Sequence, residues 1–151
     1  MSSESEDPSA DDAGRFDRAV EHWNARRFWH AHEDWEDLWN EAYDDHKRWL
    51  QGLIQYAAAF FHFERGFYAS GFQRLMATAT EKTADYEGPR HHLDWERLRQ
   101  DLEPWIAYGS AVAAGADFPD APAALPVLRY EPGYVPAPLA WEPEEDDAHG
   151  P

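Results

Sequence analysis

A chain of 151 residues with eight Trp, eight Phe and seven Tyr carries enough apolar surface for one hydrophobic core, which argues against a disordered chain. The lack of cysteine excludes disulfide bonds, thiolate zinc sites and cysteine nucleophiles. Thirty acidic residues against thirteen basic ones give a formal net charge of −17, which repels the phosphate backbone of nucleic acids.

The bases indicate an unusual environment. Only Lys47 and Lys82 among them are lysines, and strong acidity with few lysines is typical of salt-accumulating halophilic archaea. An ordinary acidic protein is the alternative interpretation. The sequence contains no run of about 18 or more apolar residues, so no membrane span is expected. Its acidic start is unlike a signal peptide. We therefore expect a cytoplasmic protein that binds neither membranes nor nucleic acids.

Apolar residues at helical spacing predict an all-α fold, a compact bundle of about five helices within residues 14–115. The helices are expected over residues 15–26, 30–43, 47–67, 69–86 and 94–113. The third is apolar on nearly all sides, which predicts the buried centre of the bundle. Its small residues Gly52, Ala59 and Gly66 form a stripe that predicts close approach of another helix. Pro104 predicts a kink or a break in the fifth helix.

The two ends of the chain differ from the bundle in composition. Residues 1–13 and 144–151 are acidic and lack apolar periodicity, which predicts disordered tails. Residues 116–143 hold seven of the eleven prolines, interleaved with aromatic and aliphatic residues. They are expected to form an extended arm that packs on the bundle or on a neighbouring subunit. In the second case the arm would build a homo-oligomer, and its apolar residues would also suit a protein partner.

The segment from Phe28 to Trp39 contains two histidines, three tryptophans and four acids within twelve positions. On a helical wheel one face collects His32, Glu36, Trp39 and Tyr43. The opposite face, with His30 and Asp34, reads as a solvated acidic surface. A polar group among large aromatics costs about 1–3 kcal/mol unless it finds partners. The pair His32 and Glu36 therefore predicts a site.

The central helix offers a matching polar stripe. Gln51, Gln55 and His62 lie on one side of it, with Ala58 as a small gap between them. Buried polar groups need hydrogen-bond partners. We therefore expect this stripe to face His32 and Glu36 across the helix interface.

Three interpretations of this cluster compete. In the first, His32, Glu36 and His62 bind a divalent metal such as Zn, Mn or Fe, and Glu33 is the catalytic base of a hydrolase-like site. Gln51 and Gln55 would then hold a bound water or a ligand carbonyl. In the second, the same residues form a metal-free pocket for a small molecule. In the third, they form a closed hydrogen-bond network that only fixes the register of the helices.

The other histidines are weaker candidates. His91 and His92 follow a Gly-Pro turn and read as surface residues, while His22 and His46 lie near helix ends and are expected to be exposed. No glycine-rich phosphate loop, nucleotide fingerprint or serine nucleophile elbow is present in the sequence.

Two motifs together resemble a known family. One is Phe28…Ala31-His32-Glu33-x-Trp35-Glu36-x-x-Trp39, and the other is Leu50-Gln51-Gly52-Leu53-Ile54-Gln55-x-Ala57-Ala58-Ala59-x-x-His62 followed by Gly66. Over roughly residues 15–85 the chain resembles the family catalogued as domain of unknown function 309, a small all-helical family of bacteria and archaea. The resemblance implies a helical bundle in which the two motifs are in contact. Family members are sometimes labelled metal-dependent hydrolases without an established activity. The proline-rich arm departs from the family pattern.

Overall fold

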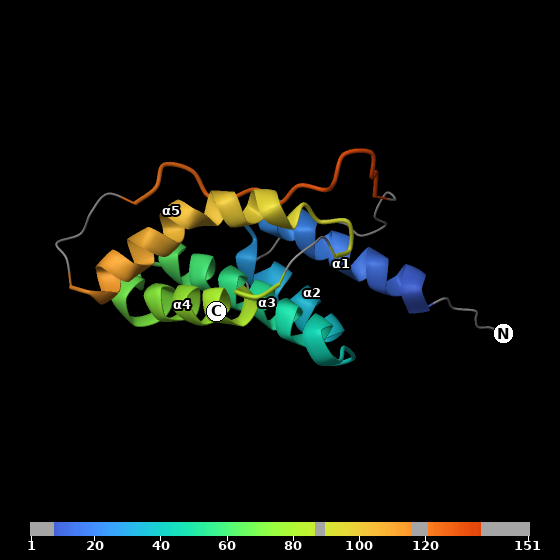
Figure 1. The fold of residues 1–151 in the computed structure, drawn as a ribbon, viewed down its shortest axis with the longest axis horizontal. Helices are drawn as coiled ribbons and strands as arrows, with labels where there is room; N and C mark the ends of the chain where they lie inside the picture. The colour runs from blue at the N-terminus through green and yellow to red at the C-terminus, as the bar shows by residue number, and fades with distance from the viewer. Residues whose placement is uncertain (1–7, 87–89, 116–120, 137–151) are drawn as a thin grey trace.

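Helices form the fold of the computed structural model, which describes residues 8–86, 90–115 and 121–136. The α-helices in this part of the chain are α1 (Pro8–Asn24), α2 (Phe28–Trp39), α3 (Asp44–Glu64), α4 (Gln73–Thr83) and α5 (Trp95–Ala113), and a π-helix η1 (Tyr68–Phe72) precedes α4 (Figure 1). The described residues contain no strand, only isolated bridges at Leu93. The predicted all-α bundle of about five helices is confirmed.

Helix α3 is the centre of the bundle. It packs against α2 on one side and α4 on the other, while α1 packs on α2 and α5 packs on α4. The core is aromatic, and its fully buried tryptophans come from four helices: Trp23, Trp35, Trp49, Trp95 and Trp105. Burial of rings this large supplies most of the hydrophobic stabilisation. An apolar sequence on nearly all sides of α3 is what such a central position requires.

The ends of α2 and α3 lie two to four residues from their predicted positions, and three other features of the helices differ from the prediction. Helix α1 begins at Pro8, inside the segment predicted to be a tail, because a proline is well accommodated in a first turn where its missing N–H has no partner to lose. The helix expected over residues 69–86 divides into η1 and α4. Helix α5 runs through Pro104 without ending, since this proline lies on the exposed side while Leu102 and Trp105 hold the helix against the core.

The two glycines of the predicted stripe are required for different physical reasons. A methyl group at Gly52 would overlap the side chain of Thr83 on α4, so this glycine permits close approach of the two helices. Gly66 has a φ of +85° and no atom near its absent side chain, so it serves the backbone turn after α3 instead. The stripe therefore marks one close approach, at Gly52.

Residues 121–136 of the predicted arm lie along α5 and α1 of the same chain (Figure 1). The indole Nε1 groups of Trp105 and Trp23 donate to the carbonyls of Ala124 and Pro126, at 3.0 and 2.8 Å. The domain boundaries and an oligomer through the arm stay predictions. Residues 1–7 and 137–151, with most of the predicted tails, lie outside the described residues.

None of the helices in the described ranges is long and apolar enough to cross a membrane.

Candidate functional site

The predicted pair on α2 lies at the edge of the helix interface and not inside it. The His32 ring stacks on Trp29, with centroids 4.6 Å apart, and its Nε2 is 4.0 Å from the carboxylate of Glu36. The side chain of Glu36 is 50% exposed, and Glu33 is also exposed. The buried face of α2 consists of Phe28, Ala31, Trp35 and Leu38. The pair is thus brought together beside the core, with His32 mostly covered and Glu36 exposed to solvent.

The polar stripe of α3 is also only partly buried. Gln51, Gln55 and His62 all keep some exposure, as does Ala58 between them. Three atoms of the predicted cluster are buried without a hydrogen-bond partner in the described residues, namely Gln55 Oε1, His32 Nδ1 and His62 Nδ1. A closed network would satisfy these atoms. The structure therefore gives no support to a closed network.

The three predicted metal ligands do not form a metal-binding group. Among the described residues no set of three or more His, Cys, Asp or Glu side chains is placed to hold one ion. His32 and Glu36 approach each other, whereas His62 packs on η1, where a methyl group at Gly71 would lie 2.8 Å from the imidazole Cγ. A catalytic zinc site ordinarily needs three protein ligands. The metal site and the role of Glu33 as its base therefore stay predictions.

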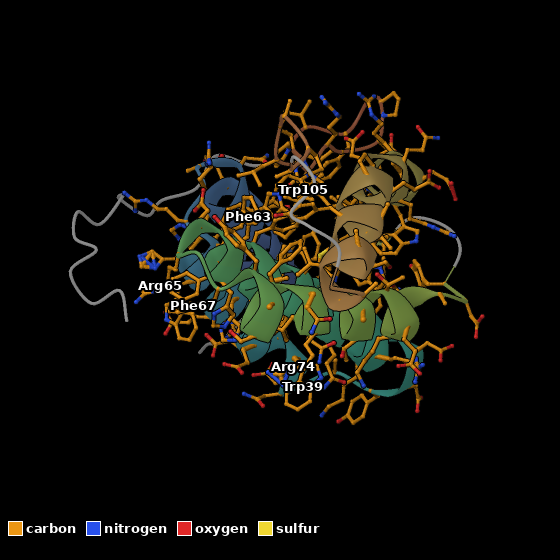
Figure 2. All side chains as sticks on the ribbon, turned by 90° about the vertical axis from the view of Figure 1, so that its left-hand side faces the viewer. Trp39, Phe63, Arg65, Phe67, Arg74 and Trp105 are labelled. Atoms are coloured by element: carbon orange, nitrogen blue, oxygen red, sulfur yellow. The ribbon has the colours of Figure 1, made fainter. Side chains whose placement is uncertain are left out.

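His62 instead borders a cavity of about 400 Å³ between the end of α3 and the start of α4. The lining consists of His62, Phe67, Ser70, Gly71, Arg74, Leu75 and Thr78. None of these seven residues is acidic, although the chain has 30 acids. Figure 2 shows Phe67 and Arg65 together near the end of α3, and the Arg65 guanidinium lies 6.0 Å from the centre of the Phe67 ring. The volume lies within the range of small-molecule sites.

The charge of this cavity comes from arginine. Burial, and then the positive charges of Arg65 and Arg74, lower the pKa of His62, so the imidazole is neutral at pH 7. One terminal nitrogen of Arg74 donates to the backbone carbonyl of Ser70 at 2.9 Å, and the hydroxyl of Thr78 donates to the carbonyl of Arg74 at 3.0 Å. Arg74 is an exposed residue, so the rest of its guanidinium faces solvent. The cavity can therefore offer a positive charge, a neutral imidazole and apolar walls to one ligand.

A second polar cluster lies where the sequence predicted solvated residues. His22 is only 6% exposed, and its Nε2 is 3.6 Å from Asp34 across the interface of α1 and α2. Its ring meets that of His30 edge to face at 5.1 Å. Burial raises the pKa of Asp34 to about 6 and lowers the pKa of His22 to about 4. The prediction of exposure was wrong for His22, because the sequence does not reveal which α2 residues face its helix.

His46 and His91 form a third cluster. Their Nε2 atoms are 3.4 Å apart, and the His91 ring stacks on Phe16 with centroids 4.3 Å apart. Burial lowers the pKa of both imidazoles, to about 4 for His91. Both residues are partly buried, which corrects the expectation that His46 is exposed and His91 a surface residue. Their partners are distant in sequence and could not be read from local spacing.

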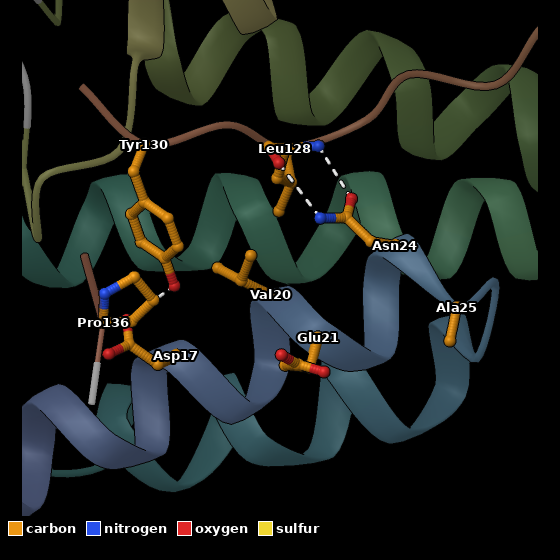
Figure 3. A pocket seen from close by; sticks show the side chains of 8 residues that line it. All are labelled: Asp17, Val20, Glu21, Asn24, Ala25, Leu128, Tyr130 and Pro136. Carbon is orange, nitrogen blue, oxygen red and sulfur yellow. Dashed lines mark hydrogen bonds between the residues drawn. The ribbon is translucent and has the colours of Figure 1, made fainter. Parts of the chain in front are cut away.

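The arm closes a further cavity of about 390 Å³ over α1 (Figure 3). The side chain of Asn24 forms two hydrogen bonds with the backbone of Leu128. The Asn24 Nδ2 donates to the Leu128 carbonyl at 3.0 Å, and the Leu128 N–H donates to the Asn24 Oδ1 at 2.8 Å. The hydroxyl of Tyr130 donates to the buried Asp17 at 2.6 Å. These side chains serve to hold the arm, since each polar group already has its partner.

Comparison with known proteins agrees with the residues that carry the resemblance. No curated protein and no solved structure matches this chain. Residues 16–75 match the model of the family described as "Domain of unknown function (DUF309)", a segment that includes α2, α3, η1 and the His62 end of the cavity, and this match supports the family resemblance.

Proposed function

We propose that the protein is a ligand-binding helical domain whose cavity beside His62 takes a small carboxylate that carries an apolar group. The observation that carries the proposal is an acid-free cavity of about 400 Å³ in a chain of net charge −17. The sequence motifs also allowed a metal-free pocket, but of the residues expected to form it only His62 lines this cavity. A metal-free ligand is favoured because no three ligands converge on one point among the described residues.

Each part of the ligand has a counterpart in the lining. The Arg74 guanidinium receives the carboxylate, because its planar set of donors matches the two carboxylate oxygens. Phe67 and Leu75 contact the apolar group. His62 is neutral at pH 7, so it offers one N–H donor or one lone pair without adding charge. Gly71 leaves the space in which the imidazole lies.

The experiment compares benzoate with its uncharged analogue benzamide, using the imidazole carbon and proton signals of His62 in NMR spectra. Benzoate is expected to shift these signals in a saturable way, and benzamide is expected to bind at least about tenfold more weakly because it lacks the charge. Arg74→Gln should remove the preference. Arg97→Gln on α5 is the matched control, because Arg97 is exposed outside the cavity and pairs with Asp101.

Two results would contradict the proposal. Benzoate that fails to shift His62, or that shifts it equally in the Arg74→Gln variant, leaves the cavity without a ligand role. A stoichiometric zinc titration that shifts His32 and His62 together would instead favour the metal-dependent hydrolase, with Glu33 as its base. The pair of His32 and Glu36, 4.0 Å apart, is the observation that makes this rival worth testing.

The setting of this function follows from charge. We propose that the protein works in the cytoplasm of a salt-accumulating halophile, because molar salt screens the mutual repulsion of 30 acids. Low lysine content supports the same setting.

A further inference from the structure

A second cavity, of about 310 Å³, lies near the start of α3, at the opposite end of that helix from His62. It is formed by the first turns of α3, the end of α4 and the segment before α5. Three of its lining residues are basic: Arg48, Lys82 and Arg90. Two are acidic, so the lining carries a net positive charge in a chain that is strongly negative elsewhere.

The side chains of the two arginines are held by hydrogen bonds to uncharged groups. The Nε of Arg48 donates to the backbone carbonyl of Lys82 at 3.0 Å, which ties α3 to α4. The Nε of Arg90 donates to the Tyr86 hydroxyl at 2.8 Å, and its guanidinium lies 5.1 Å from the centre of the Tyr86 ring. In the described part of the chain none of the three bases forms an ion pair with an acid. The terminal guanidinium nitrogens thus remain available to a ligand.

An aromatic side chain lines the same cavity. Trp49 is only 1% exposed, and its ring packs against that of Tyr86 with centroids 5.5 Å apart. Its buried indole Nε1 has no hydrogen-bond acceptor in the described residues, which also holds for Trp35, Trp39 and Trp95. Trp49 is therefore a reporter of what enters the cavity, and the bases are the groups that bind.

The two acids limit the size of the anion. Asp45 and Asp85 are both exposed, and they would repel an extended polyanion that reached beyond the cavity. A single dianionic group meets the three bases without this penalty.

We propose that this cavity binds the phosphate group of a small phosphomonoester. Guanidinium groups bind phosphate oxygens in pairs, and lysine adds a point charge. Arg48 and Arg90 bind the phosphate oxygens, and Lys82 adds charge. This site is separate from the His62 cavity, and no residue lines both.

The test follows the indole N–H signals of the full-length, ¹⁵N-labelled chain. Inorganic phosphate is titrated against sodium chloride at equal ionic strength. The indole signal of Trp49 is expected to move and to saturate, because its ring lines the cavity. Its absence in Trp49→Phe identifies it, and if that variant unfolds, through-space contacts to the Tyr86 ring, 5.5 Å away, identify it instead.

Arg48→Gln and Arg90→Gln are each expected to raise the phosphate Kd about tenfold, the usual effect of losing a charged hydrogen bond. Arg74→Gln, which disrupts the His62 cavity, is the matched control and should leave the phosphate Kd unchanged. Failure of benzoate binding and failure of phosphate binding are thereby independent of each other.

Glycerol 3-phosphate distinguishes the two sources of phosphate. Tighter binding than inorganic phosphate supports a phosphomonoester, whereas equal or weaker binding means that the cavity takes only the free ion and overturns the assignment to an ester. An indole signal that does not move, or an affinity that is the same in Arg48→Gln and the wild type, would overturn the site itself.

Discussion

The contact between α3 and α4 at Gly52 yields a sharp prediction about stability. In Gly52→Ala the new methyl group would overlap the Cγ2 of Thr83, and it would lie 3.5 Å from the Ala79 carbonyl oxygen. Thr83 cannot turn away cheaply, because it is 4% exposed and its hydroxyl donates to Ala79 O at 3.0 Å. We therefore expect the two helices to be forced apart.

The magnitude follows from two opposing effects. Overpacking costs about 1–3 kcal/mol, while replacing glycine by alanine inside a helix gains about 1 kcal/mol. Since the obstacle is a buried β-branched side chain, the net loss for Gly52→Ala should be about 1–2 kcal/mol. Thr83→Ser removes the Cγ2 but keeps the hydroxyl bond, and it should cost about 1 kcal/mol, as for one buried methyl group.

The assay is a double-mutant cycle by urea unfolding. In the Thr83→Ser background the obstacle is gone, so Gly52→Ala should be neutral or should stabilise the protein by up to about 1 kcal/mol. The expected coupling between the two sites is therefore about 1–3 kcal/mol. Equal destabilisation by Gly52→Ala in both backgrounds, within about 0.5 kcal/mol, would refute the close approach of the helices at this point.

Three further predictions concern the arm, pH and salt. Asn24→Ala removes both bonds to Leu128 and should lower the free energy of unfolding by about 1–3 kcal/mol, with faster proteolysis of the arm, whereas the exposed Asn40→Ala should change neither. Burial lowers the pKa of His91 to about 4, below its unfolded value of 6.5, so its contribution to stability is present above pH 6.5 and is lost as the pH falls towards 4. His91→Phe should reduce this pH-dependent loss of stability by roughly 1–2 kcal/mol, which is less than the full linkage value because the ring is partly exposed. A curve of stability against pH that is unchanged in the variant would contradict this prediction. Raising potassium chloride from 0.1 M to 2 M should raise the unfolding midpoint by screening the charge of −17, and a midpoint that stays constant or falls would count against a halophilic setting.

Helix existence was predictable because apolar periodicity is a local property of the sequence. All five α-helices appear where periodic apolar residues predicted them, and the apolar α3 lies at the centre. The boundaries were less predictable. The wider turn of the π-helix is seen in the bond from the Phe72 N–H to Phe67 O at 2.9 Å. It depends on packing against α3, because Gly71 makes room for the His62 imidazole. Nothing in local spacing signals that wider turn.

The predicted site residues lie in surroundings that the sequence did not indicate. The wheel placed Tyr43 on the inward face of α2, yet this residue is 78% exposed. Helix α2 ends at Trp39, and Tyr43 has an extended backbone before α3, so the helical period no longer applies to it. The predicted site residue His62 borders a cavity that is completed by Arg74 and Ser70, which no motif in the sequence marked.

The arginines of this chain differ in the groups that their side chains meet. Arg26 and Arg97 are paired with Glu64 and Asp101, at 2.7 and 3.4 Å, which is the arrangement expected where acids outnumber bases. Arg48 and Arg74 instead donate to backbone carbonyls and form no ion pair in the described part of the chain. The two arginines differ in their surroundings, because no acid lines the cavity beside Arg74, whereas Asp45 and Asp85 line the cavity beside Arg48. An anionic ligand is therefore expected to depend most strongly on charge in the cavity beside Arg74, where no acid opposes it.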